Sequence, residues 1–167
     1  GRKTQSEFPG ESPGILRPVE QWSNTDIATI SFGQGIAVNL LQVACAYAII
    51  GNKGRQVSPR FIQKITNKNS SVIFKESSNP TQKRIISEQS AQDSLLALEK
   101  TVSLGSARRA IIPGFRVGGK TGTAQIPLSN GIGYKKGAYA SSFVMILPIE
   151  EPKFVIAVAI FDAKKEY

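Results

Sequence analysis

A lysine and two threonines stand close together in the glycine-rich stretch VGGKTGTAQI, residues 117–126. Lys120 is a cation, and the hydroxyls of Thr121 and Thr123 can donate hydrogen bonds, so the stretch suits a small anionic group. Glycine weakens the interior of a strand unless another backbone or a ligand must come close. The stretch could therefore be an anion-binding strand, a phosphate-binding loop or an ordinary glycine-rich turn.

The phosphate-loop interpretation fits the letters but not their context. Residues 114–121 match the pattern G-x-x-x-x-G-K-[ST], with Gly114 as the first glycine. A phosphate loop must open a helix. Here Gly122 and Pro127 follow the lysine, with β-branched and polar residues between them. We therefore interpret the match as accidental and expect a strand.

The chain contains no histidine and a single cysteine. A Ser-His-Asp triad, a Cys-His pair or a histidine-bound metal cannot be formed from its own residues. Cys45 lies in the apolar run LLQVACAYAII, which favours a buried small hydrophobe. We expect no metal site, no cofactor and no disulfide within the chain.

The composition fits one globular domain of 167 residues, because 41% of them are hydrophobic and can form a core. The net charge is +9. The basic residues are scattered, and they lack the alternation with aromatic residues that is typical of an RNA-binding sheet. We therefore expect no nucleic-acid partner. No stretch is long enough to span a membrane.

The order of apolar and turn segments predicts an α+β fold, in which helices cover an antiparallel sheet. Asn39 can cap a helix that runs to about Ile50, and its apolar residues predict burial on all sides. Ser87 can cap a second helix, from about Glu88 to Val102, whose leucines we assign to the core. The expected strands are residues 61–65 and 71–74 as a hairpin, then 116–126, 138–147 and 153–161 as a meander. The last strand is apolar throughout, which is typical of a strand buried on both faces.

An ordered set of short motifs resembles the class B penicillin-binding proteins, the transpeptidases that cross-link peptidoglycan. The segment KTGTAQ, residues 120–125, matches the third active-site motif of that family, K-T-G, with its T-A-Q extension. Asn39-Leu40 and Ser106 depart from the Thr-Pro and Thr that are common at these places, and Asp162 slightly favours the division-type enzyme. The other matching segments are FPGE (8–11), SFGQG (31–35), LQ (41–42), AYA (46–48), GSA (105–107) and PGF (113–115).

The resemblance implies that residues 1–167 form the C-terminal part of a penicillin-binding/β-lactamase-like transpeptidase domain. This family transfers acyl groups with a serine nucleophile and a lysine base in an S-x-x-K motif, helped by an S-x-N motif. No serine of this chain has a lysine three residues on, and the S-x-N match at residues 77–79 lies where the family does not place that motif. We expect both motifs to precede Gly1 and the family's final helix to follow Tyr167. This chain alone would then lack its nucleophile and be inactive.

The resemblance assigns roles to four residues. Lys120 would hold the S-x-N hydroxyl and raise the local positive potential. Thr121 and Thr123 would bind the terminal carboxylate of a stem peptide or of a β-lactam, and the backbone N–H of Thr123 would be one of two oxyanion donors. Gly122 would let the substrate backbone approach. Because side chains alternate along a strand, we expect a local twist or bulge that brings Lys120 and the threonines to one cleft.

The resemblance also implies partners and a location for the intact protein. It would bind D-Ala-D-Ala stem peptides and β-lactams at the periplasmic face of the inner (plasma) membrane, and it would meet membrane-anchored partners of division or elongation. Two alternatives stay open. The chain could be a fragment of a related serine D,D-carboxypeptidase or β-lactamase, which share K-T-G, or a non-catalytic remnant that binds stem peptide. The FGxG and LQ segments favour the transpeptidase.

Overall fold

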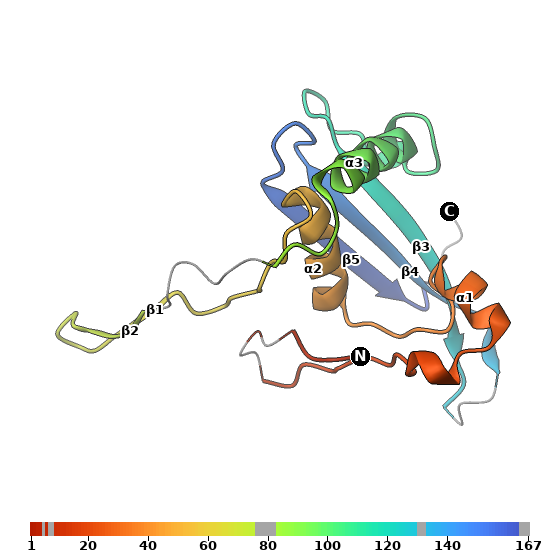
Figure 1. The fold of residues 1–167 in the computed structure, drawn as a ribbon, viewed down its shortest axis with the longest axis horizontal. Coiled ribbons are helices and arrows are strands. Elements are labelled where there is room, and N and C mark those ends of the chain that lie inside the picture. The colour runs from red at the N-terminus through yellow and green to blue at the C-terminus, as the bar shows by residue number, and fades with distance from the viewer. Residues whose placement is uncertain (5, 7–8, 76–82, 130–132, 164–167) are drawn as a thin grey trace.

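The computed structural model describes residues 1–167 apart from residues 5, 7–8, 76–82, 130–132 and 164–167. Its centre is an antiparallel sheet of β3 (Gly118–Pro127), β4 (Tyr134–Leu147) and β5 (Phe154–Phe161), in that order. The helices α2 (Leu40–Gly51) and α3 (Glu88–Ser103) lie on one face of this sheet (Figure 1). The predicted α+β architecture, an antiparallel sheet covered by helices, is therefore confirmed.

Helix α2 begins where the sequence predicts, but it is less buried than expected. The side chain of Asn39 accepts a hydrogen bond from the backbone N–H of Gln42, and the side chain of Gln42 accepts one from the N–H of Asn39, so the two form a capping box. No residue of the helix is fully buried, and Leu40 is 42% exposed. The expected burial on all sides is wrong: among the described residues α2 packs against β4, β5 and α3, but none of its residues is fully buried.

Helix α3 carries part of the buried core. Ser87 caps it by accepting a hydrogen bond from the N–H of Ser90, as predicted. Its fully buried residues are Ala91 and Val102, whereas Leu96 is 51% exposed, so the assignment of that leucine to the core is wrong. The core cluster joins the end of α3 to the sheet and consists of Val102, Ala107, Val117 and Met145.

Strand β5 is covered on one face, not on both. Val155, Ala157 and Ala159 are half-buried on the side that α2 packs against. The alternate side chains, Phe154, Ile156, Val158 and Ile160, are between 46% and 64% exposed. The predicted burial on both faces is therefore not found, because the described residues place no helix on the second face.

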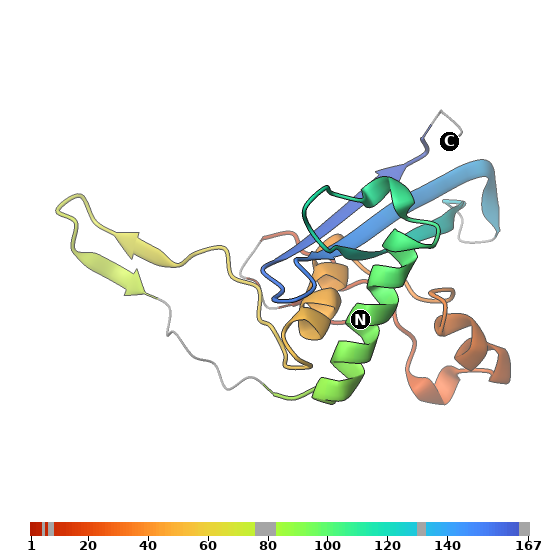
Figure 2. The ribbon, with the colours of Figure 1, turned by 90° about the horizontal axis from the view of Figure 1, so that it is seen from above.

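Two segments stand outside this core. The helix α1 (Asn24–Ile30) escapes the sequence prediction, although Ser23 and Asp26 form a capping box at its start. The predicted hairpin is confirmed as β1 (Lys64–Thr66) and β2 (Val72–Lys75), which form a separate sheet. Both views show this hairpin projecting away from the rest of the molecule (Figures 1 and 2).

A carboxylate ties the N-terminal segment to the start of α2. The Oε1 atom of Glu11 accepts hydrogen bonds from the N–H of Thr4 at 2.8 Å and from Nδ2 of Asn39 at 3.2 Å. Its Oε2 atom accepts from the hydroxyls of Thr4 at 3.1 Å and of Ser6 at 3.2 Å. Desolvation acts to raise the pKa of Glu11, but these hydrogen bonds outweigh it and lower the pKa below its ordinary value. The neighbouring Phe8, part of the FPGE segment, lies outside the described residues.

We expect the contribution of Glu11 to stability to disappear in acid. A carboxylate whose pKa is lowered by folding stabilises the protein above its unfolded pKa, and this stabilisation is lost as the pH falls through the folded pKa, here below about pH 4. The variant Glu11→Gln should have a lower urea midpoint at pH 7 and a smaller loss of midpoint between pH 5 and pH 3 than the wild type. The control is Glu20→Gln, at an exposed position of the 3-10 helix Val19–Gln21. Equal acid sensitivity of Glu11→Gln and the wild type would contradict the prediction.

Candidate active site

The K-T-G segment lies on β3, the edge strand of the sheet. The register between β3 and β4 runs without a shift from Gly118 to Gln125, and the irregularity comes after Gln125. Of the local twist or bulge expected at the motif, the bulge is therefore absent. Instead, the Lys120 side chain folds over its own strand: its Nζ atom donates a hydrogen bond to the carbonyl oxygen of the next residue, Thr121, at 2.8 Å.

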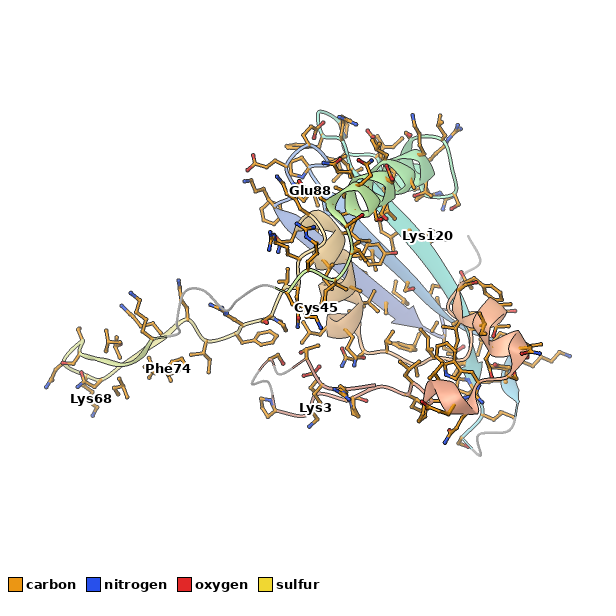
Figure 3. All side chains as sticks on the ribbon, in the orientation of Figure 1. Lys3, Cys45, Lys68, Phe74, Glu88 and Lys120 are labelled. Atoms are coloured by element: carbon orange, nitrogen blue, oxygen red, sulfur yellow. The ribbon has the colours of Figure 1, made fainter. Side chains whose placement is uncertain are left out.

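The side chains of the motif divide between the two faces of the sheet. Lys120 lies opposite Val144 and Gly122 lies opposite Ser142, so both are on one face. Thr121, opposite Phe143, is on the other face, and Thr123 follows by alternation. The long and exposed Lys120 side chain, shown in Figure 3, is the member of the set that can curl over the strand edge.

The backbone N–H and C=O groups of the odd-numbered residues of β3 point away from β4. The carbonyl oxygen of Gly119 accepts a hydrogen bond from the hydroxyl of Thr101 on α3, and that of Thr121 accepts one from Lys120. Alternate residues of a strand direct their N–H and C=O groups to the same side. The N–H of Thr123 therefore points to the outer edge, where no strand among the described residues pairs with β3.

The glycines of the motif make room for neighbouring side chains. A Cβ atom on Gly119 would lie 2.6 Å from Cζ of Phe143, and one on Gly118 would lie 2.7 Å from Cδ1 of Ile149. A Cβ atom on Gly122 would lie 2.6 Å from the hydroxyl oxygen of Ser142, which itself donates to the carbonyl of Gly122 at 3.5 Å. The packing of the sheet thus supplies a reason for these glycines that involves no ligand.

Two hydroxyls near the motif were not predicted as site residues. Ser142 on β4 lies against Gly122, as described above, and the hydroxyl of Ser106 lies 3.5 Å from the hydroxyl of Thr121. Ser106 belongs to the GSA turn after α3, so the turn is the sequence signal for it. Ser142 has no such signal, because it becomes a neighbour of the motif through the strand register alone.

Arg116, just before the motif, forms ion pairs with two glutamates of the same domain. Its Nε and Nη2 atoms donate to the two carboxylate oxygens of Glu99 at 2.6 and 2.7 Å, and Nη1 lies 3.0 Å from Glu150. These hydrogen bonds between Arg116 and Glu99 lower the pKa of the Glu99 carboxyl group and raise the pKa of the Arg116 guanidinium. A surface hollow beside this cluster is lined by Gly114, Phe115, Arg116, Pro148 and Glu150, and it includes no residue of the motif.

The described residues hold no group of histidine, cysteine, aspartate or glutamate side chains placed to bind a metal. Within the same part of the chain, none of the helices has the length and apolarity needed to cross a membrane. Cys45 is half-buried on α2, and its desolvation raises the pKa of the thiol. The S-x-N match at residues 77–79 lies outside the described residues.

Comparison with known proteins places this geometry in a family. Residues 1–167 match the family model described as the penicillin binding protein transpeptidase domain. The chain is 34% identical over 164 residues to stage V sporulation protein D of Bacillus subtilis, covering 98% of this chain and 25% of that protein. It is 35% identical over 156 residues to the probable peptidoglycan D,D-transpeptidase PbpC of Pseudomonas aeruginosa, covering 92% of this chain and 25% of that protein.

A solved structure agrees with these matches. The crystal structure of penicillin binding protein 3 from Mycobacterium tuberculosis, complexed with aztreonam, superposes with a TM-score of 0.91 at 31% identity, over 99% of this chain and 38% of that chain. This chain thus spans about a quarter of the length of the curated relatives above, 25% of each. Because the family model matches the chain from residue 1 to residue 167, the chain belongs to the transpeptidase domain family of the penicillin-binding proteins.

Proposed function

We propose that this chain supplies the K-T-G wall of the active site in a serine-type D,D-transpeptidase, which cross-links peptidoglycan stem peptides by acyl transfer and binds β-lactams. The observation that carries the proposal is the open edge of β3, where Thr123 points its N–H outward and Lys120 lies beside the carbonyl of Thr121. An extended peptide can pair with such an edge as an added strand. The stem peptide would therefore be held through its backbone along β3.

Each motif residue then has a role at the reacting end of the substrate. The hydroxyls of Thr121 and Thr123 donate to the terminal carboxylate, and the N–H of Thr123 donates to the oxyanion that forms when the serine attacks. Lys120 supplies a fixed positive charge and holds the S-x-N hydroxyl. Gly122 keeps the strand free of a side chain where the substrate backbone arrives. These roles rest on the family's motif and on the geometry of β3.

We propose further that residues 1–167 are the C-terminal part of the transpeptidase domain. The S-x-x-K and S-x-N motifs and the final helix would belong to the rest of the protein. The bare apolar face of β5, formed by Phe154, Ile156, Val158 and Ile160, supports this division, because apolar side chains on a sheet face are stabilised by a covering layer. The quarter-length coverage of the curated relatives also supports it.

The intact protein would then work in the cell envelope, at the periplasmic face of the inner membrane, with membrane-anchored partners of division or elongation. The name of PbpC, a probable peptidoglycan D,D-transpeptidase, supports transpeptidation over the carboxypeptidase and β-lactamase alternatives. The solved structure with aztreonam supports β-lactam binding, since its fold is shared over nearly the whole of this chain.

Labelling with a fluorescent penicillin tests the proposal. The full-length protein should form a covalent adduct that survives a denaturing gel, whereas a chain of residues 1–167 should form none because its serine residues lack the S-x-x-K lysine. A labelled band from the isolated chain would contradict the assignment of the nucleophile to the rest of the protein.

The lifetime of the adduct separates the alternatives. A transpeptidase should keep its penicilloyl group for hours, whereas a β-lactamase should release it within minutes by hydrolysis. A full-length protein that binds a D-Ala-D-Ala peptide but never labels would instead be the non-catalytic remnant. The measurement is the decay of the fluorescent band after removal of free penicillin.

A further inference from the structure

The β1–β2 hairpin stands apart from the sheet and exposes apolar side chains. All residues from 60 to 75 are exposed, and both views show the hairpin projecting from the molecule (Figures 1 and 2). Ile65, Val72, Ile73 and Phe74 are 44%, 54%, 67% and 38% exposed. An isolated two-stranded hairpin is at best marginally stable in water. A projecting arm of this kind gains stability when a partner covers it.

The two faces of the hairpin differ in chemistry. Lys64 lies directly opposite Lys75, and on the alternate face Ile65 lies directly opposite Phe74. Like charges directly opposite each other destabilise a sheet, whereas an aromatic side chain opposite a β-branched one stabilises it. The hairpin therefore combines an apolar pair with an unfavourable pair of cations, which acidic groups on a partner would relieve.

The strands and turn of the hairpin are basic. Residues 64–75 contain Lys64, Lys68 and Lys75 and no aspartate or glutamate, and Glu76 is the first acidic residue after them. Lys64, Lys68 and Lys75 form no ion pair with any residue that the structure describes. An acidic partner is therefore the electrostatic complement of the arm.

The turn at the end of the hairpin is polar and locally fixed. The Oδ1 atom of Asn67 accepts hydrogen bonds from the N–H groups of Asn69 at 3.0 Å and Ser71 at 2.9 Å, and the N–H of Asn67 donates to the carbonyl of Ser71 at 2.9 Å. Lys68 lies at this tip, beyond Phe74 (Figure 3). A loop that enters a membrane needs apolar residues at its tip, whereas here they lie along the strands. The arrangement favours a protein partner over a lipid surface.

We propose that the β1–β2 hairpin is a docking arm for an extended, acidic segment of another protein, which adds as a strand to one of its edges. Each strand of a two-stranded sheet has one edge whose N–H and C=O groups can pair with a further strand. The lysines disfavour a second copy of the hairpin as the occupant, because like charges would meet. Acidic side chains of the added strand would contact Lys64 and Lys75, and its apolar side chains would contact Ile65 and Phe74.

Binding of a synthetic peptide in which glutamate and valine alternate tests the proposal with the full-length protein. Fluorescence anisotropy should show saturable binding that weakens at high salt, and the variant Lys64→Glu/Lys75→Glu should bind at least about tenfold more weakly. Ile65→Ser/Phe74→Ser should also weaken binding. The matched control is Lys3→Glu/Lys136→Glu, which makes the same charge change at exposed positions outside the hairpin and should bind like the wild type. Penicillin labelling of each variant checks that the domain is folded.

Two readouts decide the outcome. Hydrogen exchange should show that the peptide protects amides of residues 64–75, and protection confined to other segments would overturn the proposal. Absence of saturable peptide binding, or equal losses in the hairpin variants and the control, would also overturn it. Vesicles of equal parts phosphatidylglycerol and phosphatidylcholine should not bind through the hairpin. If they do while the peptide fails, the arm is a lipid contact and the proposal is wrong.

Discussion

Replacement of Lys120 by alanine in the full-length protein is expected to slow acylation by a fluorescent penicillin about 10²–10³-fold, the usual cost of losing one preorganised electrostatic contact at a reacting centre. Lys120 is exposed at the edge of β3, and its Nζ atom donates to the carbonyl oxygen of Thr121 at 2.8 Å. The alanine variant loses the fixed cation at the carboxylate end of the substrate. It loses little burial, so its thermal midpoint should stay close to that of the wild type.

A second lysine provides the control for this experiment. Lys153, in the turn between β4 and β5, forms an exposed ion pair with Glu151. Such pairs contribute about 0–1 kcal/mol to stability. Lys153→Ala should therefore label at the rate of the wild type, although it removes the same charge. Near-normal labelling of Lys120→Ala would reject the role given to Lys120. Slow labelling of both variants would point to the net charge of the domain instead.

The sequence was sufficient to predict the elements that carry strong local signals. Asn39 and Ser87 cap the two main helices, and three strand-like segments joined by short connections predicted the meander. Burial was predicted less well, because an apolar run shows that a face must be covered and not what covers it. The outer face of β5 is the clearest case: Phe154 is 64% exposed although the strand is apolar throughout.

The site shows the same division between local and non-local information. K-T-G could be recognised as a motif on a strand, but its relation to β4 depends on the register. The register places Ser142 against Gly122 and keeps the motif free of a bulge. The sequence of β3 alone predicts neither the contact with Ser142 nor the absence of a bulge, because both depend on how β3 pairs with β4. Of the expected twist or bulge, the bulge is absent, and the flexible Lys120 side chain instead reaches over the strand edge to the carbonyl oxygen of Thr121.

Gly122 offers a test that separates packing from substrate approach. A Cβ atom at this position would lie 2.6 Å from the hydroxyl oxygen of Ser142 and 4.0 Å from its Cβ atom. Gly122→Ala should therefore displace the Ser142 hydroxyl. Because that hydroxyl can rotate about the Cα–Cβ bond, the loss of stability should be about 1 kcal/mol, at the low end of the usual cost of overpacking. The double variant Gly122→Ala/Ser142→Ala removes that hydroxyl and leaves the two Cβ atoms in ordinary contact. Its urea midpoint should return toward that of Ser142→Ala alone.

Acylation should respond differently from stability in these variants. If Gly122 keeps β3 open to the substrate backbone, its new methyl group misplaces the bound penicillin whatever occupies position 142, and a misplacement of about 1 Å can cost about 10²-fold in rate. Gly122→Ala and the double variant should then both label slowly, whereas Ser142→Ala should label normally. Recovery of fast labelling in the double variant would show that Gly122 serves only the contact between β3 and β4. The variants Gly122→Ala, Ser142→Ala and their combination form a double-mutant cycle. If the double variant regains stability but still labels slowly, the loss of acylation rate comes from the methyl group at position 122 on the substrate-binding edge of β3.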